Sequence, residues 1–230
     1  MKDINVNATV SEKATIGRFV IVEEDVVIAD NVIIGDFCVI RKGSTIGRGT
    51  VLENQIEIGE NCTLAEDCTI QSYTLIHDKV KLGKNAQIGS FSILHEDSVY
   101  GEDNVIGSYC ELGKKLNVGN ENIIQGRIRT GDSCTIEDNV TIKYGTILTA
   151  NVLLKKNAFL GPNVITLGST HKRVTVHGTI IGSSTYIGAG SKIAGGTQIA
   201  DNIVTGALSF VNKDLSEAGI YVGVPVRKIK

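Results

Sequence analysis

Residues 16–40 read IGRFVIVEEDVVIADNVIIGDFCVI, and an aliphatic residue returns at every sixth position of this stretch. The same phase extends in both directions, from Ile4 to Thr166. Of its 28 positions, 26 are Ile, Leu, Val or Tyr, and the two exceptions are Thr130 and Thr166. A fixed period over most of a chain indicates a solenoid, and six residues suit one short strand followed by one turn.

The other positions of the repeat agree with this reading. Gly often follows the apolar residue, where a turn needs a permissive backbone. Asn recurs three residues after the apolar position, as its tolerance of left-handed backbone predicts; it does so at 31, 61, 85, 139, 151, 157 and 163. The five cysteines share one small inward position of the hexapeptide, and they are Cys38, Cys62, Cys68, Cys110 and Cys134. We therefore interpret them as small core residues and predict neither disulfides nor a metal site from them.

The period breaks once. After Thr166 the next apolar position in phase is Ile181, and this step (181 − 166 = 15) is nine more than the repeat needs. The nine extra residues must leave the repeating body as a loop. We expect one domain over 1–230, with coils over 1–166, an extruded loop over 167–180, coils over 181–212, and a cap and tail over 213–230. The cap begins with a short helical turn over 212–218, stopped by Gly219.

The bulk composition excludes some classes of protein. Charged residues are 21% of the chain and the net charge is −2, which is unlike a strongly basic nucleic-acid binder. The chain has no run of 18 apolar residues and no apolar signal core at its start. We expect a cytoplasmic protein with no membrane span and no nucleic-acid partner.

The hexapeptide pattern resembles that of the left-handed parallel β-helix superfamily over nearly the whole chain. The resemblance implies an all-β fold in which three hexapeptides form one triangular coil. About eleven coils follow, nine before the loop and two after it.

The carboxyl third resembles the acyltransferases of this superfamily, in particular the maltose, galactoside and streptogramin O-acetyltransferases. The likeness rests on the run 159–164 (FLGPNV), on a loop that bears a histidine, on 206–214 (GALSFVNKD) and on the close 221–227 (YVGVPVR). It implies a homotrimer that transfers an acyl group from acetyl-coenzyme A or another acyl-coenzyme A, with no metal required.

The resemblance also implies the residues of the donor site. Backbone amides of Ala189 and Ala207 would hold the pantetheine arm, and these residues are three repeats apart (207 − 189 = 18), as stacking on adjacent coils requires. Lys213 matches a residue near the adenine, and Arg227 and Lys230 match basic residues that face phosphates. Positive charge suits that role physically.

His171 matches the loop histidine of the O-acetyltransferases. Acyl transfer to a hydroxyl needs a base near neutral pH, which imidazole supplies. Two further histidines, His77 and His95, are three repeats apart (95 − 77 = 18) and stack on one edge of the coil, each followed by an acid. This resembles the His–acid pair of sugar N-acetyltransferases, although the register differs by one position.

The resemblance to these acyltransferases implies a sugar hydroxyl or amine as the acceptor. A nucleotide-linked amino sugar and a surface-glycan precursor are the candidates. The sequence leaves open which sugar it is, whether oxygen or nitrogen is acylated, the acyl chain, and which histidine is the base, if any. Two alternatives from other classes are a non-catalytic β-helix scaffold and a hydratase resembling the γ-class carbonic anhydrases. The outward residues of the face that leads to the His77–His95 edge are largely apolar, which predicts a partner subunit there.

Overall fold

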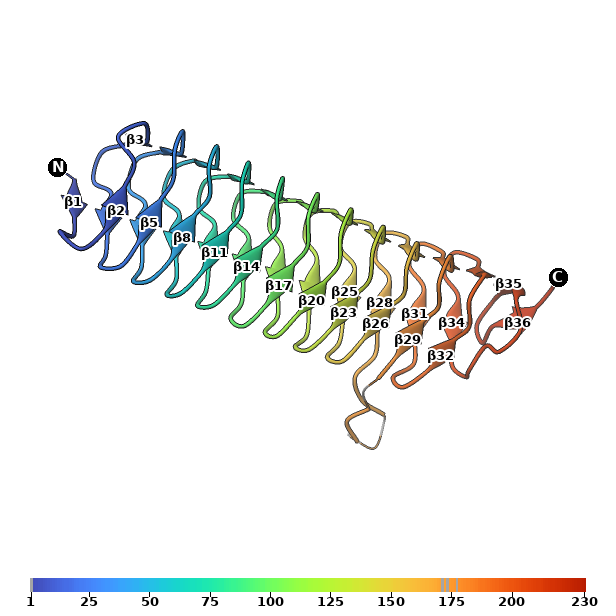
Figure 1. Cartoon of the computed structure of the whole chain (residues 1–230). Coiled ribbons are helices and arrows are strands. Elements are labelled where there is room, and N and C mark those ends of the chain that lie inside the picture. Colours follow the sequence, from blue (N-terminus) through green and yellow to red (C-terminus); the bar gives the residue numbers. More distant parts are fainter. Residues whose placement is uncertain (1, 171, 173, 177) are drawn as a thin grey trace. The chain divides into compact units, whose positions relative to one another are not determined.

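The computed structural model describes every residue except Met1, His171, Arg173 and His177, so the predicted base His171 lies outside the described residues. The described chain forms two compact units, Met1–Lys115 and Leu116–Lys230. Below they are the amino-terminal and the carboxyl-terminal unit, and each is considered by itself. Figure 1 shows their short strands along the chain.

The amino-terminal unit consists of two-residue strands that begin at every sixth position, as the period predicts. In each strand the first side chain points outward and the second inward, because successive side chains of a strand alternate. Its strands are β1 (Asp3–Ile4), β2 (Thr9–Val10), β3 (Thr15–Ile16), β4 (Ile21–Val22), β5 (Val27–Ile28), β6 (Ile33–Ile34), β7 (Val39–Ile40), β8 (Thr45–Ile46), β9 (Val51–Leu52), β10 (Glu57–Ile58), β11 (Thr63–Leu64), β12 (Thr69–Ile70), β13 (Leu75–Ile76), β14 (Lys81–Leu82), β15 (Gln87–Ile88), β16 (Ile93–Leu94), β17 (Val99–Tyr100), β18 (Val105–Ile106) and β19 (Glu111–Leu112).

Every third strand pairs in parallel, so three hexapeptides make one coil. Asp3 opposes Ile21 at one end of the first sheet and Ile93 opposes Glu111 at the other. The sheets run β1-β4-β7-β10-β13-β16-β19, β2-β5-β8-β11-β14-β17 and β3-β6-β9-β12-β15-β18. The predicted fold class, an all-β left-handed parallel β-helix, is confirmed.

Turns between strands place one residue at positive φ, three positions after the inward apolar residue. The turn asparagines singled out above all adopt it, for example Asn31 at 59° and Asn61 at 54°. Bulky residues occupy the same place in other coils, including Phe19 at 56° and Tyr73 at 64°. Since this region is unfavourable for bulky L-residues, the ladders on either side must impose the turn geometry in those coils.

The interior is a column of aliphatic side chains and small residues. All five cysteines are buried and free, which confirms their interpretation as core residues. Their thiols donate to backbone carbonyls, for example from Cys62 to His77 at 3.0 Å. Burial raises the pKa of Cys62 and of Cys134 to about 11, so both thiols stay protonated at neutral pH.

The carboxyl-terminal unit repeats this construction. Its strands are β20 (Asn117–Val118), β21 (Ile123–Ile124), β22 (Arg129–Thr130), β23 (Thr135–Ile136), β24 (Thr141–Ile142), β25 (Ile147–Leu148), β26 (Leu153–Leu154), β27 (Phe159–Leu160), β28 (Ile165–Thr166), β29 (Ile180–Ile181), β30 (Tyr186–Ile187), β31 (Lys192–Ile193), β32 (Gln198–Ile199), β33 (Ile203–Thr205), β34 (Phe210–Val211), β35 (Gly219–Val222) and β36 (Arg227–Lys228). Its sheets run β22-β25-β28-β31-β34, β20-β23-β26-β29-β32 and β21-β24-β27-β30-β33-β35-β36.

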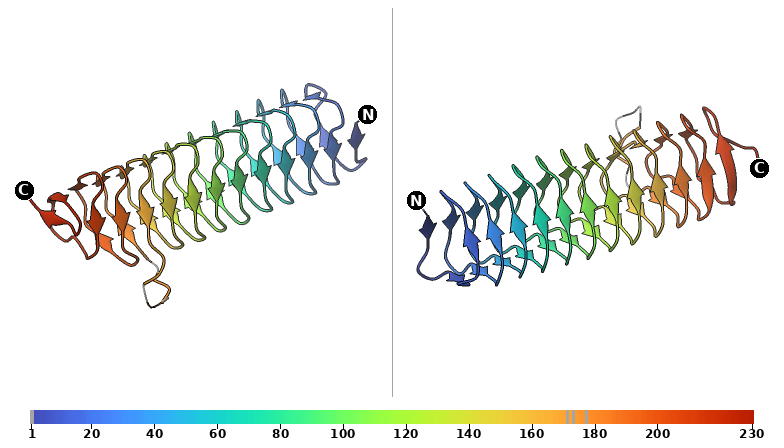
Figure 2. Two further views of the ribbon diagram at one scale, coloured as in Figure 1. Left: turned by 180° about the vertical axis from the view of Figure 1, so that it is seen from behind. Right: turned by 90° about the horizontal axis from the view of Figure 1, so that it is seen from above.

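The register of this unit changes once, between β28 and β29. Leu153 pairs with Ile180, and their separation in sequence (180 − 153 = 27) is one coil plus nine positions. The described residues of this insertion leave the stack of coils in Figure 1 and in the right view of Figure 2. They form a small hairpin in which Ser169 bridges Thr175 in antiparallel fashion. The predicted extruded loop is thereby confirmed.

Thr166, one of the two exceptions to the apolar phase, lies at the root of this loop. It points inward and is 1% exposed. Its hydroxyl lies 2.8 Å from the backbone nitrogen of Thr149, which donates to it, and 2.9 Å from the hydroxyl of the same residue. A polar side chain is tolerated here because its oxygen is satisfied within the coil.

The expected helical turn over 212–218 is wrong, because the described residues of the chain contain no helix. Instead Leu215 pairs with Ile199, donates its N–H to the carbonyl of Gln198 and is 2% exposed. Burial of one more aliphatic side chain over the last coil outweighs the weak helix signal. β35 then adds in parallel to β33, and β36 returns antiparallel on it. No described helix is long and apolar enough to cross a membrane.

Candidate functional site

Ala189 and Ala207 present open backbone amides on adjacent coils. At this place in several other hexapeptides, the N–H donates to a side chain one coil on; that of Arg18 reaches Asp36 at 2.7 Å and that of Ser183 reaches Asp201 at 2.8 Å. The residue one coil on from Ala189 is Ala207, which has no side-chain acceptor. Neither amide N–H has a hydrogen-bond partner among the described residues.

The two alanines belong to one column of the coil. The N–H of Leu208 donates to the carbonyl of Ala189 at 2.8 Å, and that of Gly190 donates to the carbonyl of Pro162 at 2.8 Å, so Pro162 is the preceding member. Ala189 is half-buried and Ala207 is exposed. Two such donors, one coil of about 4.8 Å apart, can bind successive carbonyl groups of an extended ligand.

The predicted cations lie beyond the last coil. Gly206 donates its N–H to the carbonyl of Tyr221 at 2.8 Å, and the neighbouring Val222 pairs with Arg227. This places Arg227 two strands from the strand that precedes Ala207. The buried Val226 anchors the tail, since it donates its N–H to the carbonyl of Phe210 at 3.0 Å.

The side chains of these cations differ in their partners. Lys228 forms an ion pair with Glu217 at 2.9 Å, and this contact lowers the pKa of the Glu217 carboxyl. By contrast Lys213, Arg227 and Lys230 are exposed and have no ion-pair partner within the described part of the chain. They are therefore available to an anionic group, whereas Lys228 is engaged.

The loop that bears His171 is described except at that residue and at Arg173 and His177. Its hairpin is closed by a hydrogen bond from the N–H of Thr170 to the carbonyl of Val174 at 2.9 Å. The role of His171 stays a prediction.

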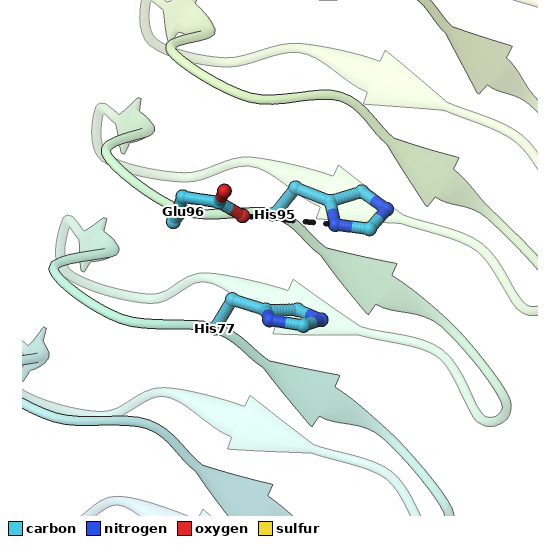
Figure 3. A group of neighbouring side chains, drawn as sticks. All are labelled: His77, His95 and Glu96. Atoms are coloured by element: carbon cyan, nitrogen blue, oxygen red, sulfur yellow. Dashed lines mark ion pairs between the residues drawn. The ribbon is translucent and has the colours of Figure 1, made fainter.

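The second histidine pair lies in the amino-terminal unit. His77 and His95 directly follow β13 and β16, and their rings stack with centroids 4.9 Å apart and planes 26° apart. Figure 3 shows both rings projecting from the same edge, with Glu96 beside them. Nδ1 of His95 lies 3.9 Å from Oε2 of Glu96, and Nε2 lies 3.8 Å from Oε1 of Glu111.

Lys114 holds the Glu96 carboxylate. Its ammonium contacts Oε1 of Glu96 at 2.6 Å, and this hydrogen bond lowers the pKa of the Glu96 carboxyl. The surrounding depression of about 410 Å³ is lined by His77, Asp78, Lys79, His95, Glu96, Asp97 and Lys114. The spacing of the sequence brings together the two histidines, each with an acid after it, but it does not by itself place Glu96 beside both rings. The signal available was the spacing of Glu96 and Lys114, which is one full coil (114 − 96 = 18).

Comparison with known proteins bears on the fold. The family model described as "GMPPB C-terminal domain" matches residues 3–99, which are 97 of the 230 residues. A comparison with proteins of curated function gave no match.

Solved structures are similar to this chain at low identity. PerB from Caulobacter crescentus, in complex with CoA and GDP-perosamine, is 20% identical over 55% of this chain and 57% of that chain, with a TM-score of 0.50. The acetyltransferase domain of PglB from Neisseria gonorrhoeae FA1090 is 16% identical over 55% of this chain and 57% of that one, also at 0.50. A UDP-N-acetylglucosamine acyltransferase from Francisella novicida is 22% identical over 94% and 70% of the two chains, with a TM-score of 0.47. The chain thus spans little more than half of the two acetyltransferases.

Proposed function

We propose that this protein is a coenzyme A-dependent acyltransferase, and specifically an acetyltransferase, that acts on a hydroxyl or amino group of a sugar. The observation that carries the proposal is the pair of open amides at Ala189 and Ala207, one coil apart and followed by the exposed Arg227. An acyl-coenzyme A offers amide carbonyls along an extended arm and phosphates at its far end. The folds of PerB and PglB, solved with CoA and with acetyl coenzyme A, support this choice of donor.

The donor would lie along the column of the two alanines. Their N–H groups donate to carbonyls of the pantetheine arm, while Arg227 and Lys230 face the phosphates and Lys213 lies near the adenine. Charge-assisted contacts of this kind are about twice as strong as neutral hydrogen bonds.

In the transfer step, the acceptor oxygen or nitrogen attacks the thioester carbonyl carbon. Its proton passes to the imidazole of His171, and a backbone N–H stabilises the oxyanion. The C–S bond then breaks, and the departing thiolate takes up the proton. An amine acceptor needs this base less than a hydroxyl does, because a neutral amine is already nucleophilic. A nucleotide-linked amino sugar is the acceptor we favour, since PerB binds GDP-perosamine.

The assembly we propose is a cytoplasmic homotrimer of single-domain chains spanning 1–230. In the amino-terminal unit, the outward residues of the first sheet from β4 to β19 are Ile21, Val39, Glu57, Leu75, Ile93 and Glu111. Four of the six are apolar, and Ile21 is 41% exposed. Changing both Leu75 and Ile93 to Lys should lower the mass in light scattering from trimer to monomer. The matched pair Val27→Lys and Val99→Lys, on another face, should leave it unchanged.

A backbone substitution tests the donor site directly. Proline lacks an N–H, and Pro162 shows that this column accepts proline after glycine. Ala189→Pro combined with Ala207→Pro should therefore weaken coenzyme A binding at least tenfold in calorimetry while thermal unfolding stays close to wild type. Ala150→Pro makes the same change at the same repeat position outside this column, and should leave the affinity unaltered. Equal affinity in all these variants would refute the proposed donor site.

A further inference from the structure

The strongest unassigned cluster in the described chain is His77, His95 and Glu96, on one edge of the amino-terminal unit. One ligand atom from each residue lies within 4.8 Å of the others. All three side chains are half-buried, so water reaches them only from one side. Two imidazoles and one carboxylate are ligand types that Zn²⁺ accepts together.

The regular coil brings these ligands together. His77 and His95 are held one coil apart because the N–H of His77 donates to the carbonyl of Leu94, and that of His95 to the carbonyl of Leu112, each at 2.9 Å. Their rings stack and project from the same edge (Figure 3). Glu96 follows His95 at the turn and reaches back along the edge.

An ion pair with Lys114 orients the Glu96 carboxylate. Lys114 occupies Oε1, which leaves Oε2 as the oxygen nearer His95, at 3.9 Å from Nδ1. An outer partner that orients a ligating carboxylate in this way is typical of metal sites.

The surrounding charges favour a cation. The groups that face the cluster are the carboxylates of Asp78, Glu96, Asp97 and Glu111 and the ammonium groups of Lys79 and Lys114. Four acids against two bases leave a negative potential at this edge. An anion would be repelled there, whereas a divalent cation would be attracted.

We propose that His77, His95 and Glu96 bind one divalent transition-metal ion of the Zn²⁺ class, separately from the acyl-donor site. Ligands at about 2.0–2.1 Å in tetrahedral geometry lie about 3.4 Å apart, so the three atoms close by up to about 1.4 Å on binding. Rotation of the Glu96 side chain and tilting of the stacked rings supply this movement. Water completes the fourth position, and the ion links two adjacent coils.

The test uses the full-length, untagged protein and titrates it with Co²⁺ and with Zn²⁺. We expect one ion per chain, visible d–d absorption of the Co²⁺ form in the range of four-coordinate N/O sites, and a higher thermal unfolding midpoint with metal. His77→Ala, His95→Ala and Glu96→Gln should each weaken binding at least tenfold, since losing even an outer-shell partner costs about 10–100-fold.

The control is the double variant His171→Ala, His177→Ala, which removes the other two histidines of the chain. It should retain wild-type metal affinity. Circular dichroism spectra that match the wild type will show that the site variants are folded. The proposal fails if the wild-type protein binds neither ion below millimolar concentration. It also fails if the three site variants bind as tightly as the wild type, or if the control loses the site.

Discussion

The two compact units place polar side chains in different ways. The amino-terminal unit keeps the register of three hexapeptides per coil throughout, and its histidine cluster sits on outward positions of regular coils. The carboxyl-terminal unit breaks the register once, by nine positions, and its predicted base lies on that insertion. A β-helix can thus acquire reactive side chains in two ways. They can stack on adjacent coils along one edge, or they can lie on an insertion in one turn. Inward positions are more tightly constrained than outward ones in both units, which the first prediction tests.

The largest effect is expected at an inward position. Ile88 is 1% exposed, and an aspartate there would be an unpaired buried charge. Ile88→Asp should lower the free energy of unfolding by more than about 4 kcal/mol, or prevent folding. Urea unfolding measures this.

The matched control is the preceding residue, Gln87, which is exposed and points to the opposite face of the same strand. Gln87→Asp should change stability by less than about 0.5 kcal/mol. If both variants unfold alike, the alternation on which the comparison rests is wrong.

The insertion should matter for turnover and not for folding. His171→Ala should lower kcat by about 10²–10⁴ for a hydroxyl acceptor while coenzyme A affinity is unchanged. Its thermal midpoint should stay within a few degrees of wild type, as for a surface change of under ~0.5 kcal/mol.

His95→Ala provides the contrast within a regular coil, and it should affect turnover much less. The reverse ranking would move the active site to the stacked pair. Full activity in both variants would show that the acceptor attacks unaided.

A smaller effect is expected in the tail. Arg227→Ala combined with Lys230→Ala should weaken coenzyme A binding by about 1–3 kcal/mol, the range for charge-assisted contacts. Calorimetry measures it. Lys228→Ala is the matched control, because this lysine is paired with Glu217. Affinity that survives the double change would remove the tail from the donor site.

The sequence predicts the body of this fold well because each coil obeys the same constraint. Inward residues such as Ile76 must be apolar, and turn residues such as Asn61 must tolerate positive φ, so both recur with period six. The helical turn predicted around Leu215 is wrong because the pairing partner of Leu215, Ile199, lies on another coil, and a local sequence pattern contains no information on such pairing.

In the candidate sites too, the features that follow from the six-residue period are predictable, and those that depend on individual side-chain contacts are not. The stacking of His77 on His95 was predictable, since positions three repeats apart share a column. The position of Glu96 beside the two rings was not predictable. It depends on the conformation of a turn side chain and on the ion pair of that side chain with Lys114. The backbone N–H of Ala189 is unpaired for a similar reason. Ala207, the residue one coil on, has no side-chain acceptor for it.

The smallest effect on stability is expected from removing the insertion itself. Deletion of residues 168–176 leaves Leu167 joined to His177 and restores the step of six positions from Thr166 to Ile181. In the shortened turn, Gly178 takes the place that Asn163 has one hexapeptide earlier. Both have positive φ, 81° and 58°, so the new turn needs little backbone adjustment.

Thr179, which is 1% exposed, already fills the small inward position that follows. The thermal midpoint of this variant should therefore stay within a few degrees of wild type, because the backbone hydrogen bonds of the described hairpin residues, from Thr170 to Val174 and from Val176 to Gly168, lie within the deleted segment. Deletion of one position more, 168–177, is the control. It leaves a step of five where the coil needs six and turns inward side chains to the wrong face, so it should unfold far more easily. Equal thermal stability of the two deletion variants would show that the six-residue register between β28 and β29 does not determine the stability of this coil.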